Sequence, residues 1–258
     1  MSKLQDILAQ TMAKVGSVVE KVASKVDKKG GRPQPKKTGV TDEEGQDFAA
    51  IQWDEKHIQA LLSGAERTKL FPLIPALSGK QSLHLTPSSV DYLSLLDKRG
   101  AEDIVELDVQ KTSDITEKPD AKPHRLARGS IDKLPFKDKI FDFVLYPSAL
   151  SWRADLPLLF PEMVRVLKDN GRFVISVVHP FFEYLMNPRG GFRKNIGDLF
   201  SEMKAQGFFV DELKEATLDE TLRIVSLPPK LNKDLKRFQG MPILLLMRGI
   251  LVRKKSKP

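Results

Sequence analysis

The sequence predicts an α/β protein with a mostly parallel sheet of seven strands, helices on both faces and an antiparallel last strand. Strand and helix patterns alternate from about Trp53 onward, and such alternation is typical of a parallel sheet. The segment RFVISVV, residues 172–178, is almost continuously apolar, as expected of a strand covered on both faces. No helix is expected between the last two predicted strands, which indicates an antiparallel end to the sheet.

Each expected element follows from its own pattern. A parallel core is predicted from four strands, at residues 82–86, 103–109, 141–147 and 172–178. Three further strands are predicted, at residues 124–130, 221–227 (TLRIVSL) and 242–253. Apolar residues at helical spacing predict helices, at residues 53–77, 90–100, 155–171 and 196–207. The third of these helices is expected to end at Asn170-Gly171, a common C-terminal stop.

The N-terminal part of the chain has a different character. Residues 3–26 carry apolar side chains at spacings of three and four, with lysines between them, which predicts an amphipathic helix. A polar stretch rich in glycine and proline follows and indicates a flexible linker. We therefore expect a basic amphipathic helix plus linker at 1–37, a helical lead-in at 38–80 and a globular domain at 81–258.

Charge and composition exclude several classes of site. The net charge is +8, of which residues 1–37 contribute +6 and the last ten residues +4, so the remaining body is slightly acidic. The chain has no cysteine, which excludes disulfides and thiolate metal sites.

The four histidines show no ligand spacing, so no metal is expected. No apolar run approaches the roughly 20 residues of a membrane span, and P-loop and G-x-S-x-G motifs are absent. A cytoplasmic protein is expected.

Residues 128–180, RGSIDKLPFKDKIFDFVLYPSALSWRADLPLLFPEMVRVLKDNGRFVISVVHP, carry a recognisable order of landmarks. These landmarks are Leu134-Pro135-Phe136, Phe141-Asp142, Glu162, Arg165-Val166-Leu167-Lys168 and Gly171. In this order they resemble the class I S-adenosylmethionine-dependent methyltransferases, especially the small-molecule, type 11-like group. The resemblance extends over residues 82–180 and implies a Rossmann-like fold with S-adenosylmethionine as cofactor.

The cofactor turn departs from the family. In the family a glycine-rich turn follows the first strand, where this chain has Thr86, Ser88 and Val90 at the glycine positions and His84 at a preceding acidic one. A side chain forced into left-handed backbone geometry costs roughly 1–2 kcal/mol. Two such costs would turn micromolar binding into roughly millimolar binding. The sequence predicts that S-adenosylmethionine binding is weak or lost at this turn, or that the turn takes another shape, which Pro87 would help to fix.

The other implied cofactor contacts are mixed. Asp108 ends the second strand, and the resemblance implies that this acid holds the ribose hydroxyls; a solvated aspartate is the alternative. The family's adenine-contacting acid corresponds to Ser130, followed by Ile131. Serine can accept a hydrogen bond but brings no charge. The cofactor candidates are therefore Asp108, Thr86, Ser88, Ser130 and Ile131.

Two residues are candidates for catalysis. His179 follows the fifth strand at the ligand end and could act as a base, with a structural role as the alternative. Tyr146 ends the fourth strand, and with Trp152 it could line a substrate pocket or belong to the core. The loop around Arg189-Gly190-Gly191 could be a lid or a plain surface loop.

The sequence therefore favours a methyltransferase-like protein with an eroded cofactor site, a non-catalytic scaffold or regulator of a partner. The first alternative is an active methyltransferase on a small molecule, and the second is a nucleic-acid binder with basic tails. A partner protein is expected to bind the N-terminal helix. Packing on the chain's own body and contact with an anionic membrane surface, as a peripheral protein, are the alternatives for that helix.

Overall fold

The computed structural model describes Phe48, Ile51 and residues 54–86, 92–108, 125–147, 156–186 and 195–253. The chain divides into two compact units, Met1–Gly45 and Gln46–Pro258, and all described residues lie in the second. The predicted N-terminal helix, Ser88, Val90, Trp152 and the loop at 189–191 lie outside the described residues.

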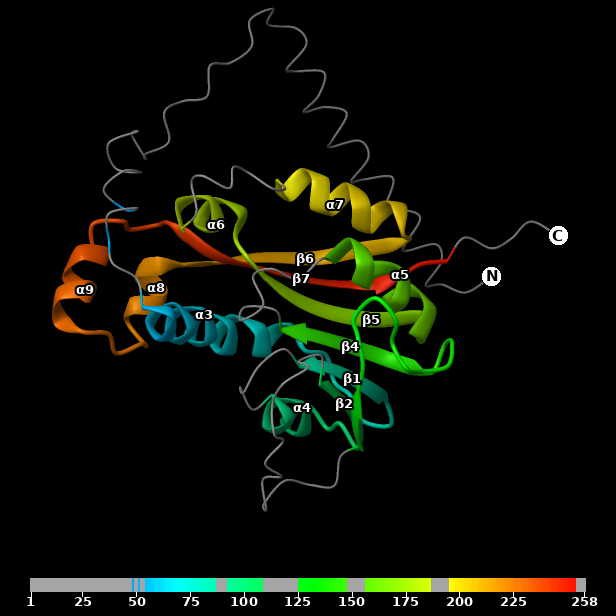
Figure 1. The fold of residues 1–258 in the computed structure, drawn as a ribbon. Coiled ribbons are helices and arrows are strands. Elements are labelled where there is room, and N and C mark those ends of the chain that lie inside the picture. The colour runs from blue at the N-terminus through cyan, green and yellow to red at the C-terminus, as the bar shows by residue number, and fades with distance from the viewer. Residues whose placement is uncertain are drawn as a thin grey trace, which may run out of the picture. The chain divides into compact units, whose positions relative to one another are not determined.

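The described part of the chain forms a single sheet of seven strands (Figure 1). The strands are β1 (Gln81–Thr86), β2 (Asp103–Asp108), β3 (Arg125–Arg128), β4 (Phe141–Pro147), β5 (Leu167–Val178), β6 (Phe208–Thr217) and β7 (Pro242–Leu251). Their order in the sheet is β3-β2-β1-β4-β5-β7-β6. β7 runs antiparallel to β5 and β6, while the other neighbours are parallel. The predicted fold class and its four-stranded parallel core are confirmed.

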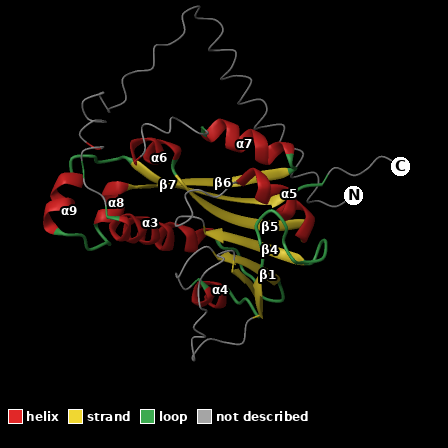
Figure 2. Ribbon diagram, in the orientation of Figure 1, coloured by secondary structure: helices red, strands yellow, loops and turns green. Residues whose placement is uncertain are grey.

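Helices cover both faces of this sheet (Figure 2). They are α3 (Glu55–Leu70), α4 (Leu93–Lys98), α5 (Leu156–Val166), α6 (Pro180–Met186), α7 (Ile196–Ala205), α8 (Leu218–Leu222) and α9 (Pro229–Leu235), with the 3-10 turn η1 (Phe71–Leu73) after α3. One core, here the first core, contains side chains of α3, α4, α6, α8 and α9. The second core contains those of α5 and α7.

Strand β1 shows how the two cores divide. Leu83 and Leu85 point into the second core, so Ser82 and His84 point to the opposite face, because side chains alternate along a strand. Both are fully buried there. The face toward α3 and α4 therefore contains buried polar groups in the centre of the sheet.

Helix α3 is part of the sheet's packing, although it lies in the segment expected to be a lead-in. It begins at Asp54, whose carboxylate accepts a hydrogen bond from the Lys56 amide at 2.9 Å, a typical N-cap. Its buried residues, spaced by three, four or one position, are Leu61, Leu62, Ala65, Glu66 and Leu70. The single charged residue in this stripe is Glu66, so a carboxylate enters the first core from α3.

The predicted strand at residues 221–227 is wrong. The sixth strand is β6, FFVDELKEAT, and residues 221–227 contain the end of α8 and a turn. β6 lies at the edge of the sheet, where alternate side chains face water, and this explains its charged sequence. A capping box of Thr217 and Glu220 starts α8 directly after β6. The expectation that no helix separates the last two strands is wrong as well, because α8 and α9 do.

Helix α5 ends earlier than predicted, at Val166 rather than Asn170. Residues 167–170 already belong to β5, and Leu167 pairs with Phe141 of β4. The guanidinium of Arg253 donates hydrogen bonds to the carbonyls of Val164 and Leu167, the latter at 2.9 Å. These bonds satisfy carbonyls that the end of a helix leaves free. The predicted stop does mark a turn, since Asn170 has a φ of 64°.

One glycine has a steric role in the sheet. A Cβ on Gly249 of β7 would lie 2.3 Å from the Phe209 carbonyl oxygen and 2.6 Å from the Phe173 ring. Glycine therefore lets the Phe173 ring lie against β7, where that ring also makes an edge contact with Phe208 at 4.9 Å between centroids.

Candidate functional site

The predicted cofactor positions line up along one edge of the sheet. Thr86 is paired with Asp108 across β1 and β2, and Asp108 is paired with Arg128 across β2 and β3. Ser130 follows two residues later. These positions lie at the carboxyl ends of three parallel strands, the edge where open α/β sheets bind ligands. The backbone thus brings together three of the positions that the sequence selects, while the side chains of Thr86 and Asp108 lie outside the described part.

Ser130 and Ile131 are in a tight turn after β3. The Ser130 hydroxyl donates a hydrogen bond to Asp132, and its carbonyl accepts one from the Lys133 amide at 3.3 Å. Ser130 is exposed, while Ile131 packs against the second core. While it donates to Asp132, the hydroxyl oxygen can still accept a hydrogen bond from a ligand.

His84 behaves as an aromatic core residue. It is fully buried, and its ring lies edge-on to that of Tyr92 with 5.4 Å between centroids. Its Nδ1 lies 3.5 Å from Glu106 Oε1, yet neither ring nitrogen has a hydrogen-bond partner among the described residues. The acidic position of the family is therefore occupied by an imidazole packed inside the first core.

His179 has both ring nitrogens engaged. Nδ1 accepts a hydrogen bond from the Phe181 amide at 3.2 Å, and Nε2 lies 3.2 Å from Glu215 Oε1. An accepting Nδ1 requires the proton on Nε2, which then donates to the carboxylate. Burial lowers the pKa of His179 below its usual 6.5, and the Glu215 charge opposes this shift. In this arrangement the neutral imidazole caps the start of α6 and ties it to β6.

Tyr146 lies in the second core rather than at an open surface. It is 1% exposed, on β4, among residues packed by α5. A substrate could reach its hydroxyl only if this packing opened.

The landmarks of the family resemblance form a connected structural network. Arg165 on α5 holds the Glu162 carboxylate with two hydrogen bonds, of 2.8 and 2.7 Å. Its guanidinium also donates to the carbonyls of Phe136 at 2.6 Å and Leu134 at 2.8 Å. Glu162 accepts from the Leu134 amide at 2.7 Å. This pair therefore fastens the connection between β3 and β4 to α5.

A second landmark pair has a similar structural role. Lys168 Nζ lies 2.7 Å from Asp142 Oδ2, and the same carboxylate accepts a hydrogen bond from the Gln81 amide at 3.0 Å. Asp142 thus connects the amino end of β1 to β4 and β5. The family landmarks that this chain keeps belong to its scaffold.

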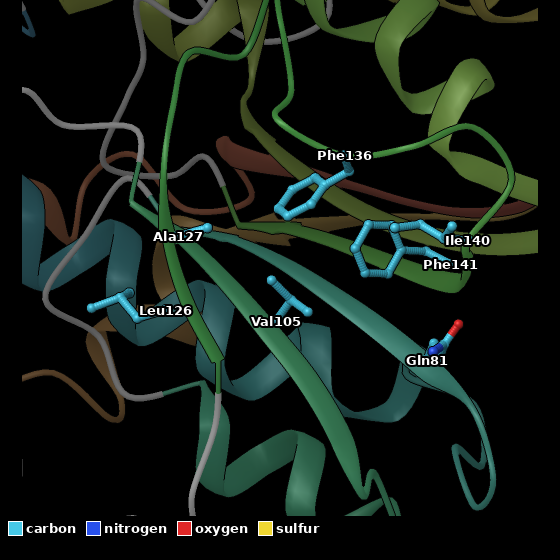
Figure 3. A pocket seen from close by; sticks show the side chains of 7 residues that line it. All are labelled: Gln81, Val105, Leu126, Ala127, Phe136, Ile140 and Phe141. Atoms are coloured by element: carbon cyan, nitrogen blue, oxygen red, sulfur yellow. The ribbon is translucent and has the colours of Figure 1, made fainter.

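A mostly apolar cavity of about 370 Å³ lies on the side of the sheet that faces the second core (Figure 3). Its lining residues are Gln81, Val105, Leu126, Ala127, Phe136, Ile140 and Phe141. Gln81 and Phe141 are the first residues of β1 and β4. Leu126 and Ala127 lie in β3, and Ala127 directly precedes Arg128, so the cavity extends from the amino ends of β1 and β4 to the carboxyl end of β3.

Sequence reasoning missed one buried polar cluster. Glu66 on α3 is 1% exposed and accepts hydrogen bonds from the hydroxyls of Tyr92 and Ser176. A signal for it exists in the sequence, because Glu66 stands four residues from both Leu62 and Leu70 on an apolar stripe. A lone carboxylate at such a position is unusual unless it is paired inside.

Within the described ranges, no three histidine or acidic side chains are grouped closely enough to hold a metal ion. None of the helices described is long and apolar enough to cross a bilayer.

Comparison with known proteins identifies a family match and several similar folds. Residues 83–175 match a family described as a methyltransferase domain. The bifunctional biotin biosynthesis protein BioHC of Cellvibrio japonicus is 31% identical over 116 residues, which are 40% of this chain and 23% of that protein. The chain thus spans about a quarter of the length of this curated relative.

Two solved structures have a similar fold. One is an S-adenosylmethionine-dependent methyltransferase from Mesorhizobium loti, with a TM-score of 0.55, 20% identity and coverage of 73% of this chain and 99% of that one. The other is a complex between the Haloferax volcanii Trm112 methyltransferase activator and a putative methyltransferase. There the TM-score is 0.59, with 17% identity and coverage of 85% of this chain and 100% of that chain.

Proposed function

We propose that this chain, whose residues 83–175 match a methyltransferase domain family, is a non-catalytic member of the class I S-adenosylmethionine-dependent methyltransferases. In this proposal the S-adenosylmethionine site is weakened, and the protein scaffolds or regulates a partner protein. It works in the cytoplasm, with membrane contact as a secondary option. The segments 1–37, 38–80 and 81–258 serve as partner-binding helix with linker, helical lead-in and methyltransferase-like domain.

The observation that carries the proposal is a contrast between two groups of family positions. The scaffold landmarks are intact and joined by direct hydrogen bonds, as in the Glu162–Arg165 pair. The cofactor positions have changed: the turn after β1 has no glycine, and Ser130 brings no charge. His84 replaces an acid and packs against Tyr92. A chain that keeps its fold but changes its ligand contacts is expected to lose the chemistry first.

Calorimetric titration of the full chain with S-adenosylmethionine and with its demethylated product tests this proposal. We expect a dissociation constant of about 1 mM, because two backbone penalties of roughly 2 kcal/mol each separate this turn from a micromolar site. Low-micromolar binding of either compound would contradict the proposal and favour the active enzyme. Far-ultraviolet circular dichroism of the same sample verifies that the titrated protein is folded.

An active methyltransferase is the second candidate, and the position of Asp108 favours it. Its backbone lies at the carboxyl end of β2, beside Thr86 and Arg128, where a carboxylate could hold the ribose. In that case Asp108→Asn is expected to weaken S-adenosylmethionine binding more than Ser130→Ala does, because hydrogen bonds to a charged group are stronger.

A partner protein is proposed to bind the apolar stripe of the N-terminal segment. A neighbouring fold is a methyltransferase bound by an activator protein, which makes a protein partner a reasonable expectation for this chain. The stripe has no Trp or Phe, and this composition favours a protein over a membrane surface. A nucleic-acid partner has only the basic ends in its favour; salt-dependent binding that disappears when both ends are removed would support it.

Val18→Asp together with Val22→Asp is expected to abolish co-purification of the partner and to leave the melting temperature within about 2 °C. In the helix predicted from the sequence both side chains fall on the apolar stripe one turn apart, so two charges there are expected to disrupt an apolar contact. Deletion of residues 1–37 is expected to have the same two effects. Quantitative co-purification and thermal unfolding measure them.

The matched control adds the same charge to the opposite side of the predicted helix, with Ser17→Asp and Ser24→Asp. This variant is expected to keep the partner. Flotation with anionic liposomes is the parallel assay: binding that only the Val18 and Val22 changes remove would replace the protein partner by a membrane. A truncated protein that loses several degrees of stability, with neither assay altered, would place the helix in the chain's own core.

A further inference from the structure

A buried polar cluster joins three elements on the α3 side of the sheet. Glu66 of α3 accepts a hydrogen bond at Oε2 from the Tyr92 hydroxyl and at Oε1 from the Ser176 hydroxyl. Tyr92 and Ser176 are completely buried, and Glu66 is 1% exposed. One carboxyl group thus connects α3 to the residue before α4 and to β5.

A carboxyl group in such a place needs both partners. Its transfer from water into the core is costly unless hydrogen bonds replace those to water. Leaving a buried acceptor unsatisfied by removing its partner costs more than the net gain from an ordinary hydrogen bond. The cluster therefore strongly favours one relative position of α3, Tyr92 and β5.

Helix α4 depends on an external anchor because it is weak by itself. It has six residues, and no side chain caps its first turn. Isolated helices of fewer than about 12 residues are marginal in water. Tyr92 is the N-cap, and its carbonyl accepts the first hydrogen bonds of the helix, from the amides of Leu95 at 3.1 Å and Leu96 at 3.0 Å. The residue that starts α4 is thus the residue that Glu66 holds.

The same cluster extends toward the carboxyl ends of the parallel strands. Ser176 on β5 is paired with Pro147, the last residue of β4, so it lies near the carboxyl end of both strands. Tyr92 is where the connection from β1 enters α4. Its ring also packs against His84 on β1. The end of β5, the start of α4 and the neighbouring strand β1 thus meet around the carboxyl group of Glu66.

We propose that Glu66 is a positioning residue that fixes where α4 begins. Because α4 follows the connection from the carboxyl end of β1, Glu66 thereby fixes the point at which that connection ends. It acts through Tyr92 and takes its own position from Ser176. This role does not depend on whether S-adenosylmethionine binds, because it concerns the unliganded chain.

Amide hydrogen exchange of the full chain, followed for the amides of Leu95 and Leu96, tests the proposal. Tyr92→Phe removes the hydroxyl and keeps the ring. We expect the exchange of these two amides to accelerate by about tenfold or more, since a buried acceptor that loses a partner costs more than an ordinary hydrogen bond is worth. The amides of β5 and β7 are expected to exchange at the wild-type rate.

Tyr146→Phe is the matched control. It removes the hydroxyl of an equally buried tyrosine on the other face of the sheet, so it is expected to leave the Leu95 and Leu96 amides unchanged. Glu66→Gln retains a carbonyl acceptor and Glu66→Leu does not, so acceleration is expected to be smaller for Gln than for Leu. If Tyr92→Phe leaves these amides unchanged, or if both tyrosine variants accelerate all amides alike, the positioning role is refuted.

Discussion

Replacing Thr86, Ser88 and Val90 together by glycine is expected to tighten binding of S-adenosylmethionine by about 30-fold to 1000-fold. In the family these three positions are glycines, which accept positive φ and let the backbone approach the ligand. If two of them require left-handed geometry, each side chain costs roughly 1–2 kcal/mol, and each 1.4 kcal/mol is a factor of ten in affinity. Calorimetric titration of the triple variant beside the natural chain measures the gain.

Alanine at the same three positions is the control for this experiment. Alanine removes most of the side-chain bulk but keeps the Cβ that disfavours positive φ. The alanine variant is therefore expected to bind as weakly as the natural chain. If it binds as tightly as the glycine variant, bulk rather than backbone geometry is the obstacle. If neither variant gains affinity, the turn is not the reason for weak binding.

Glu162→Ala is expected to lower the free energy of unfolding by about 3 kcal/mol, because it leaves Arg165 and the Leu134 amide without their shared partner. For a chain of this size the melting temperature should fall by about 6–12 °C. Chemical denaturation at pH 7 measures the difference. Asp138→Ala is the control: that side chain is 72% exposed and contacts the same guanidinium at 2.9 Å, so a change below about 1 kcal/mol is expected.

The cost of Glu162→Ala is also expected to depend on pH. Hydrogen bonding to Arg165 lowers the pKa of Glu162 below its ordinary 4.5, in spite of the opposing effect of burial. A carboxyl group with a lowered pKa in the folded state stabilises the protein above its unfolded pKa, and this contribution is lost as the pH falls through the folded value. The difference between wild type and variant is therefore expected to be full at pH 7 and smaller at pH 3. An equal difference at both values would exclude the charge as its source.

The parallel core was predictable because its strands are short apolar runs between helical patterns, with 172–178 the strongest example. β6 was not, since FFVDELKEAT is an edge strand and its charged residues are explained only by its place in the sheet. The early end of α5 depends on Arg253, which is 87 residues beyond Val166 in the chain. A contact between residues so far apart in the chain cannot be predicted from local sequence patterns.

The positions at the carboxyl ends of β1 and β2 could be predicted in part. Thr86 and Asp108 were selected as the ends of adjacent strands, and the sheet pairs their backbones directly. The apolar spacing of its helix predicts burial at the position of Glu66 but does not predict what its carboxyl group contacts. Its partners, Tyr92 and Ser176, are 26 and 110 residues away. The topology of the fold brings these residues together. The sequence pattern shows only that a carboxyl group stands on an apolar helical stripe.

The position of β7 between β5 and β6 has a consequence for the growing chain on the ribosome. β6 is synthesised before β7, and within the described part of the chain β7 is its one partner in the sheet. Until Pro242–Leu251 has emerged, β6 lacks its partner and the apolar edge of β5 is open. Unpaired strand edges of this kind promote aggregation. Nascent chains in which β6 has emerged from the ribosome and β7 has not are thus expected to be the ones that most need a chaperone. Ribosome-bound chains of graded length would reveal this through their chaperone occupancy.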